Sequence, residues 1–120
     1  MSKPLALIIE DDPDLCQIFS VALQGEFETE AIGDGQAALL RLSQVVPALV
    51  VLDLHLPGSS GSVVFEQIRS DVRLAETRTI LSTADANEAE LLRDRADLVL
   101  LKPISPIQLR ELAARFLKTS

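Results

Sequence analysis

The sequence predicts an α/β fold in which helices cover both faces of one parallel sheet. Three of its apolar runs are continuous stretches of Leu, Ile, Val and Ala without polar alternation, as in strands that are buried on both sides. Five runs alternate with segments of helical periodicity, and this alternation gives parallel strands joined by right-handed crossovers. At 120 residues the chain fits one compact domain, which we expect to span residues 1–120.

The expected strands and helices follow one another in order along the chain. We expect strands at Leu5–Ile9, Phe27–Ile32, Ala48–Leu52, Thr79–Ser82 and Leu98–Leu101. The second strand alternates between apolar and polar residues, which is typical of a sheet edge. We expect helices from Pro13 to the stop at Gly25, and over Gln36–Ser43, Ser62–Val72, Asn87–Arg95 and Pro106–Lys118. Asp12 and Ser105 precede two of these helices as caps.

Apolar residues at helical spacing predict the face that each helix buries. The predicted buried faces include Ile18 in the first helix, Val72 in the third, Leu91 in the fourth and Ile107 in the fifth. Ile18, Val72 and Leu91 each lie three or four positions from another apolar residue of the same helix or next to one, and Ile107 lies two positions before Leu109. We therefore expect all four side chains to pack against the sheet.

Charge and composition exclude several classes of protein. The net charge of −7 argues against nucleic-acid binding, which needs clustered Lys and Arg. No apolar run is long enough to span a membrane. The one cysteine, Cys16, cannot form an internal disulfide, so we expect a cytoplasmic protein. Cys16 lies between apolar residues, which favours a packing role over a reactive thiol.

Polar side chains stand at the carboxyl ends of four of the five expected strands. The first strand ends in Glu10-Asp11-Asp12, the third in Asp53, the fourth in Ser82-Thr83 and the fifth in Lys102-Pro103. Parallel strands bring their carboxyl ends to one edge of the sheet, where ligands bind in folds of this class. The sequence therefore predicts one site that combines carboxylates, a hydroxyl and an ammonium group.

The residue types at this edge suggest phosphoryl chemistry. Three carboxylates held close together repel one another, which raises a pKa or recruits a cation. Mg²⁺ suits such oxygen ligands and usually keeps waters and phosphate oxygens as further ligands. One Mg²⁺ and one lysine would neutralise the three carboxylates, and a carboxylate can itself accept a phosphoryl group. Asp12 precedes Pro13, so we expect it to cap a helix rather than bind metal.

Five short motifs follow the expected strands in the order that one known family has. They are residues 8–13 (Ile-Ile-Glu-Asp-Asp-Pro), 33–39 (Gly-Asp-Gly-Gln-Ala-Ala-Leu), 51–58 with Gly61 (Val-Leu-Asp-Leu-His-Leu-Pro-Gly), 82–84 (Ser-Thr-Ala) and 101–106 (Leu-Lys-Pro-Ile-Ser-Pro). Together they resemble the receiver domains of two-component response regulators over essentially the whole chain. The resemblance implies a flavodoxin-like (βα)5 sandwich with a parallel five-stranded sheet in the order 2-1-3-4-5.

The resemblance also implies a role for each polar residue at the strand ends. The implied ligands of Mg²⁺, or of Mn²⁺, are Asp11 and Asp53 directly, Glu10 through water, and the backbone carbonyl of His55. The implied phosphoacceptor is Asp53, with Thr83 as hydrogen-bond donor to the phosphoryl group and Lys102 as its ion-pair partner. Ser82 is the rival of Thr83, because side chains alternate along a strand and one of the two faces the site.

The function implied by the resemblance is a signalling switch. A sensor histidine kinase or a histidine phosphotransfer protein would supply the phosphoryl group, and phosphorylation would change the binding of a downstream protein. The domain would then be no enzyme beyond its own phosphorylation and dephosphorylation. Two alternatives are a constitutive binding module with the same fold and a Mg²⁺-dependent aspartyl phosphohydrolase.

Gly33-x-Gly35-x-x-Ala38 loosely matches a dinucleotide-binding motif. It follows the second expected strand rather than the first, so it is weak evidence for nucleotide binding.

His55 and the last third of the chain depart from simple expectations. His55 is either an ordinary loop residue or a group that controls how long the phosphoryl group lasts. Val99 stands where receiver domains usually have a rotating aromatic residue, and Arg95 and Ile104 replace a usual glycine and phenylalanine. Fewer residues than usual separate Thr83 from Lys102, which predicts a short fourth helix and altered output coupling.

Overall fold

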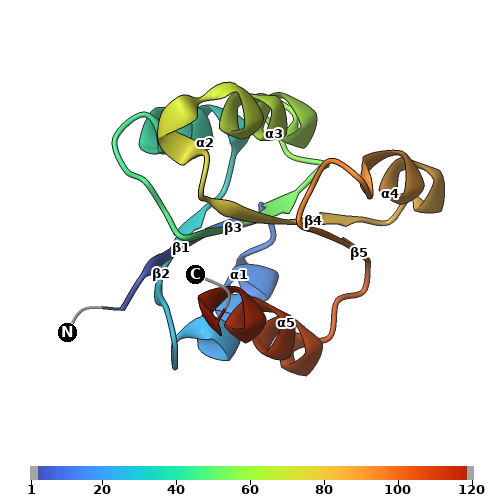
Figure 1. The fold of residues 1–120 in the computed structure, drawn as a ribbon. Coiled ribbons are helices and arrows are strands. Elements are labelled where there is room, and N and C mark those ends of the chain that lie inside the picture. The colour runs from blue at the N-terminus through green and yellow to red at the C-terminus, as the bar shows by residue number, and fades with distance from the viewer. Residues whose placement is uncertain (1–2, 119–120) are drawn as a thin grey trace.

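The computed structural model describes residues 3–118, with side chains to Leu117, as five strands and five α-helices in strict alternation (Figure 1). A short 3-10 helix, η1, precedes the fourth strand. In chain order the elements are β1 (Leu5–Ile9), α1 (Pro13–Leu23), β2 (Glu28–Ile32), α2 (Gly35–Leu42), β3 (Leu49–Asp53), α3 (Gly61–Ser70), η1 (Val72–Leu74), β4 (Arg78–Thr83), α4 (Ala86–Leu92), β5 (Leu98–Leu101) and α5 (Pro106–Lys118).

All strand pairs are parallel, and the strand order is β2-β1-β3-β4-β5. This is the order implied by the family resemblance, and β2 lies at an edge as its alternating sequence predicts. Helices α1 and α5 cover one face of the sheet, whereas α2, α3 and α4 lie on the other face (Figure 1). The predicted fold class is therefore confirmed.

The hydrophobic core has two halves, one on each side of the sheet, because successive strand residues point to opposite faces. Leu7 and Ile9 of β1 belong to the half under α2 and α3, whereas Ala6 and Ile8 belong to the half under α1 and α5. All four side chains are fully buried. Since both faces of β1 are covered, its continuous apolar sequence has a structural reason.

Acidic and hydroxyl side chains cap the helices where the sequence suggests. The Asp12 carboxylate accepts hydrogen bonds from the backbone N–H groups of Asp14 at 2.9 Å and Leu15 at 3.4 Å. The Ser105 hydroxyl accepts one from the N–H of Gln108 at 3.2 Å. Asp12 is thus engaged as a cap, as predicted, and this fixes the point at which the chain turns from β1 into α1.

Four residues predicted to pack inward are exposed instead: Ile18 (43%), Val72 (88%), Leu91 (80%) and Ile107 (67%). For Val72 the reason is local, because Asp71 takes an extended conformation that ends α3 at Ser70. The Asp71 side chain then caps the short 3-10 helix by accepting from the N–H of Arg73 at 2.9 Å. Helix α4 likewise ends at Leu92 rather than Arg95.

Gly61 marks a close approach between the start of α3 and the end of β3. A Cβ atom at this position would lie 2.4 Å from the Asp53 carbonyl oxygen and 2.4 Å from the Leu54 Cα. Both are backbone atoms that cannot move aside without shifting the end of β3. The glycine therefore allows α3 to begin directly beside Asp53.

Replacing Gly61 with alanine should lower the free energy of unfolding by about 1–3 kcal/mol, because the new methyl group overlaps backbone. The matched control is Gly25→Ala, where an added Cβ meets nothing within 4 Å. Urea denaturation of both variants measures the difference. Equal stability of the two variants would contradict the close approach.

Candidate functional site

The ends of four strands bring the predicted site residues to one edge of the sheet. Oxygen atoms of Glu10, Asp11 and Asp53 all lie within 4.8 Å of one another. Glu10 and Asp53 are 4% and 2% exposed, whereas Asp11 is open to solvent. Glu10, Asp11 and Asp53 therefore form an acidic cluster in which two carboxylates are nearly buried and the third is accessible to solvent.

Lys102 supplies a positive charge to this cluster. Its Nζ donates a hydrogen bond to Asp53 Oδ2 at 2.9 Å and lies 3.9 Å from Glu10 Oε1. The Lys102 N–H donates to the Thr83 carbonyl at 2.8 Å, and the following bond to Pro103 is cis. The other Asp53 oxygen, Oδ1, accepts from the His55 N–H at 2.9 Å. Both Asp53 oxygens are thus oriented by donors.

The electrostatics of the cluster show that it carries excess negative charge. The pKa of Glu10 is raised to about 7, chiefly by burial and also by the charge of Asp53, while the hydrogen bond from the Asp12 N–H and the charge of Lys102 lower it. Burial opposes the charge of Lys102, but its hydrogen bond to Asp53 and the carboxylates of Asp53, Glu10 and Asp11 raise its pKa overall. One lysine therefore does not balance the carboxylates.

The donor set fits a hard divalent cation. Three carboxylates with their oxygen atoms within 4.8 Å of one another match the all-oxygen preference of Mg²⁺. Burial is the main cause of the raised Glu10 pKa, and a cation would relieve the repulsion from Asp53 that adds to it. Asp12 is not among the three, because its side chain caps α1.

Thr83 and His55 meet a residue that the sequence did not single out. Thr83 Oγ1 donates to Glu88 Oε1 at 2.6 Å, and His55 Nε2 lies 3.0 Å from the same oxygen. Thr83 is fully buried, and the His55 side chain is 60% exposed. Glu88 lies in the first turn of α4, five positions after Thr83. Acidic residues are common in the first turn of helices, because they interact favourably with the helix dipole. The position of Glu88 in the sequence therefore did not indicate a role in the site.

Cys16 lies next to the acidic cluster. Its Sγ contacts the Glu10 carbonyl oxygen at 3.1 Å. Burial raises the pKa of the thiol, and the charges of Glu10, Asp12 and Asp11 raise it further. A raised pKa reduces the thiolate fraction, which supports the predicted packing role over reactivity.

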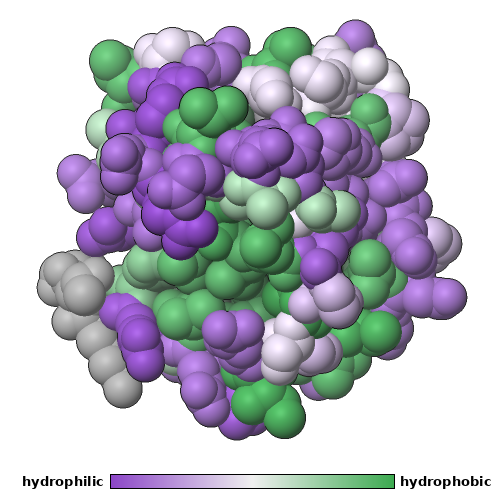
Figure 2. Space-filling view, turned by 90° about the vertical axis from the view of Figure 1, so that its right-hand side faces the viewer, coloured by the Kyte–Doolittle hydropathy of each residue, from purple (hydrophilic) through white to green (hydrophobic). Residues whose placement is uncertain are grey.

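On the side of the molecule formed by α4 and β5, both elements are short and part of the surface is apolar. Helix α4 has seven residues, as the narrow spacing between Thr83 and Lys102 predicts. All four β5 residues are at least partly exposed, and Leu101 is 48% exposed. Figure 2 shows hydrophobic side chains at the surface on this side of the molecule, between polar ones. Val99 is half-buried here and packs against the core.

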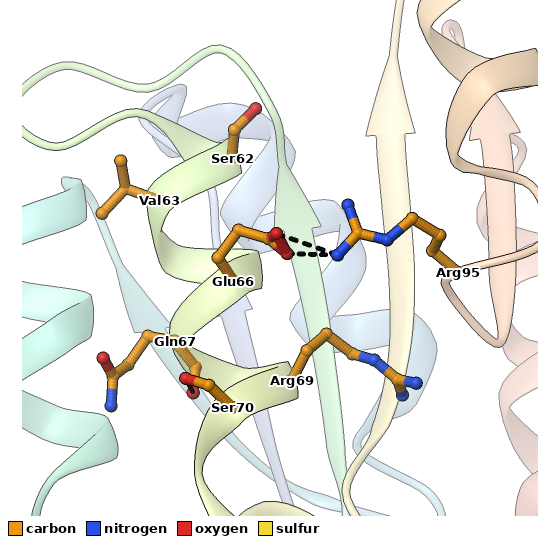
Figure 3. Close-up of a pocket in the computed structure, with 7 residues that line it drawn as sticks. All are labelled: Ser62, Val63, Glu66, Gln67, Arg69, Ser70 and Arg95. Carbon is orange, nitrogen blue, oxygen red and sulfur yellow. Dashed lines mark hydrogen bonds and ion pairs between the residues drawn. The ribbon is translucent and has the colours of Figure 1, made fainter.

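A surface hollow of about 610 Å³ lies elsewhere, along α3 (Figure 3). Its lining includes Ser62, Glu66, Arg69 and Arg95 but none of the acidic-cluster residues. Figure 3 shows the Arg95 guanidinium pointing at the Glu66 carboxylate, with two hydrogen bonds between them. The hollow is therefore separate from the candidate site.

Comparison with known proteins agrees with this geometry. The family model of the response regulator receiver domain matches residues 6–114. The DNA-binding response regulator MtrA of Mycolicibacterium smegmatis is 36% identical over 110 residues, which are 91% of this chain and 47% of that protein. Hybrid signal transduction histidine kinase D of Dictyostelium discoideum is 30% identical over 117 residues, 95% of this chain but 7% of that protein.

The solved structures agree as well. The BeF3-activated DrrB receiver domain superposes with a TM-score of 0.85 at 25% identity, covering 97% of this chain and 98% of that one. The chain spans about half the length of the MtrA proteins that it matches. Within residues 3–118, no helix is both long and apolar enough to cross a membrane. By its sequence motifs, its strand order and the match over residues 6–114, the chain belongs to the response regulator receiver domain family of two-component signalling.

Proposed function

We propose that this domain, over residues 1–120, accepts a phosphoryl group on Asp53 and thereby switches its binding to a partner protein. One observation carries the proposal. Asp53 ends a central strand almost fully buried, its oxygen lies within 4.8 Å of those of Glu10 and Asp11, and Lys102 Nζ is 2.9 Å away. A carboxylate that is oriented, surrounded by potential metal ligands and paired with a lysine suits nucleophilic attack on phosphorus.

The metal in this proposal is Mg²⁺, with Mn²⁺ as a substitute. Asp11 and Asp53 would bind it directly, Glu10 through water, and the His55 backbone carbonyl would complete the protein ligands. When bound, the cation would neutralise the carboxylates and the incoming phosphoryl oxygens. The raised pKa of Glu10 supports this assignment, because burial, and after it the charge of Asp53, disfavours the ionised carboxyl, and a nearby cation would favour it.

The proposed reaction transfers the phosphoryl group from a phosphohistidine. An Asp53 oxygen attacks phosphorus, a P–O bond forms, and the P–N bond breaks with its electron pair left on the imidazole nitrogen. Lys102 Nζ, which donates a hydrogen bond to Asp53 Oδ2 in the structure, would pair with one phosphoryl oxygen of the product. The Thr83 hydroxyl would donate a hydrogen bond to another phosphoryl oxygen. Slow attack of water on the same phosphorus would return the domain to its resting state.

The phosphoryl donor in this proposal is a sensor histidine kinase or a histidine phosphotransfer protein in the cytoplasm. The phosphorylated domain would bind a downstream protein. The domain would catalyse only its own phosphorylation and dephosphorylation. DNA binding is named for the MtrA relatives, and the net charge of −7 gives no reason to transfer it to this domain. Because Val99 cannot rotate as an aromatic residue does, we assign the output change to the loop after Thr83 and to α4.

Incubation with acetyl phosphate and Mg²⁺ should add the mass of one phosphoryl group to the protein, and Asp53→Asn should abolish the gain. Mass spectrometry of the intact protein measures both. The control is Asp71→Asn, which alters an acid outside the cluster and should leave the gain unchanged. An unmodified wild-type protein, under conditions that modify another receiver domain, would favour a constitutive binding module. Turnover of a small phosphate ester would instead favour a phosphohydrolase.

Without a divalent cation, stability should fall as the pH rises from about 4.5 to about 7. The folded state raises the pKa of Glu10 from 4.5 to about 7, so between these values it binds more protons than the unfolded chain does. The loss should reach about 2–3 kcal/mol. Urea denaturation in a chelator measures it, and Mg²⁺ at pH 7.5 should restore the loss. Glu10→Gln should flatten the pH dependence, and an unchanged slope would contradict the burial of this carboxyl.

His55→Ala should make the phosphorylated domain lose its phosphoryl group faster. The His55 ring lies 3.5 Å from Thr83 Oγ1, and its removal opens a path for water to the proposed phosphoryl position. Decay of phosphorylated protein, followed by mass spectrometry, gives the rate. Asn87→Ala, an exposed neighbour on α4, is the control. Identical decay rates for wild type and His55→Ala would mean that His55 is an ordinary loop residue.

A further inference from the structure

Glu88 is the acid at the centre of a hydrogen-bonded cluster on the rim of the site. Its Oε1 accepts the Thr83 hydroxyl at 2.6 Å and lies 3.0 Å from His55 Nε2. The Glu88 side chain is 28% exposed, so solvent only partly screens these contacts. Both of its partners belong to elements that border Asp53, namely the last position of β4 and the loop after β3.

The contact between Glu88 and Thr83 uses the only hydrogen that the threonine hydroxyl can donate. Thr83 Oγ1 donates to Glu88 and accepts from the Asp85 N–H at 3.0 Å. A hydroxyl has one hydrogen, and the oxygens of a phosphoryl dianion can only accept. Glu88 and a phosphoryl group on Asp53 therefore compete for the same hydrogen atom.

Charge adds to this competition. A phosphoryl oxygen that accepts from Thr83 Oγ1 would come within hydrogen-bonding distance of the atom that Glu88 now contacts. Two anions around one hydroxyl repel each other, and the partial burial of the cluster weakens screening. The phosphorylated state therefore disfavours the position that Glu88 occupies in the structure.

We propose that Glu88 is a latch: a positioning residue that holds Thr83 and His55 in the resting state and is expelled when Asp53 carries a phosphoryl group. This inference rests on the proposed function of Asp53. The latch joins the site to α4 directly, because Glu88 lies in the first turn of that helix. It therefore gives the domain a route from site to surface that needs no aromatic residue at the position of Val99.

The far end of α4 is held by separate contacts. Arg95, two positions beyond the Arg93 cap, donates two hydrogen bonds to Glu66 of α3 (Figure 3). Its guanidinium also lies 5.5 Å from the centre of the Phe65 ring. The Arg95 N–H also bonds to the Leu92 carbonyl at 3.0 Å. Expulsion of Glu88 would thus remove one of the contacts that hold the start of α4, while the end of the helix stays tied to α3, so the start of the helix would shift relative to its end.

The test is the affinity for beryllofluoride, a phosphoryl mimic, in the presence of Mg²⁺. The chain has no Trp or Tyr, so bound beryllofluoride is followed by fluorine NMR. Glu88→Ala should bind it about threefold to about tenfold more tightly than wild type, because the Thr83 hydroxyl no longer has to break a hydrogen bond to the Glu88 carboxylate first. Glu88→Gln should give a smaller gain, since its amide oxygen still accepts the hydroxyl hydrogen.

Two further variants separate the latch from a general effect on α4. Glu90→Ala removes another acidic residue of α4, one whose side chain is 75% exposed and pairs with Arg93. This variant should bind beryllofluoride with wild-type affinity. In a Thr83→Ala background, Glu88→Ala should bring a much smaller gain, because the hydroxyl for which the two groups compete is absent and only their charge repulsion remains. A merely structural role of Glu88 would not depend on Thr83 in this way.

Each result decides a different point. Tighter binding by Glu88→Ala, with a gain that falls by more than half in the Thr83→Ala background, supports the latch. Equal or weaker binding by Glu88→Ala, or a gain that is equally large without Thr83, overturns the latch and leaves the proposed function standing. Failure of every variant and of wild type to bind beryllofluoride with Mg²⁺ overturns both.

Discussion

Three carboxylates have oxygen atoms within 4.8 Å of one another at the carboxyl edge of the sheet, and Lys102 lies against two of them. Bringing like charges together and burying two of them costs free energy, which appears in the raised pKa of Glu10. The hydrophobic core on both faces of the sheet holds the cluster in place despite this cost. An incoming cation or a redistributed charge therefore has a strong effect at this edge.

The fold places each group at the edge with little freedom. Asp53 is the last residue of β3 and pairs in register with Ser82 of β4, so Thr83 follows at the next position. Thr83 in turn pairs with Leu101 of β5, which brings Lys102 to the same level. Gly61 lets α3 begin directly behind Asp53. Strand register, rather than any single contact, thus determines the geometry of the cluster.

This explains why the sequence predicted the cluster and missed its neighbour. Strand ends converge in any parallel sheet, so Glu10, Asp53 and Lys102 could be grouped from their positions after apolar runs. Glu88 could not, because its direction depends on where the short α4 docks rather than on local spacing. The exposure of Val72 has a related cause, because the apolar spacing of α3 continues past Asp71, where the helix has already ended. Periodicity predicts a helical face but not where the helix ends.

The central claim is that Asp53 and its neighbours form one phosphoryl site, balanced in charge only when a cation is bound, and that its occupation takes the Thr83 hydroxyl from Glu88. A crystal structure of the domain with Mg²⁺ and beryllofluoride tests it most directly. We predict a cation between Asp11 and Asp53, beryllium on an Asp53 oxygen, and Thr83 Oγ1 within hydrogen-bonding distance of a fluoride, no longer 2.6 Å from Glu88 Oε1. A cation elsewhere, or a Thr83 hydroxyl still on Glu88 with beryllofluoride bound, would contradict the account.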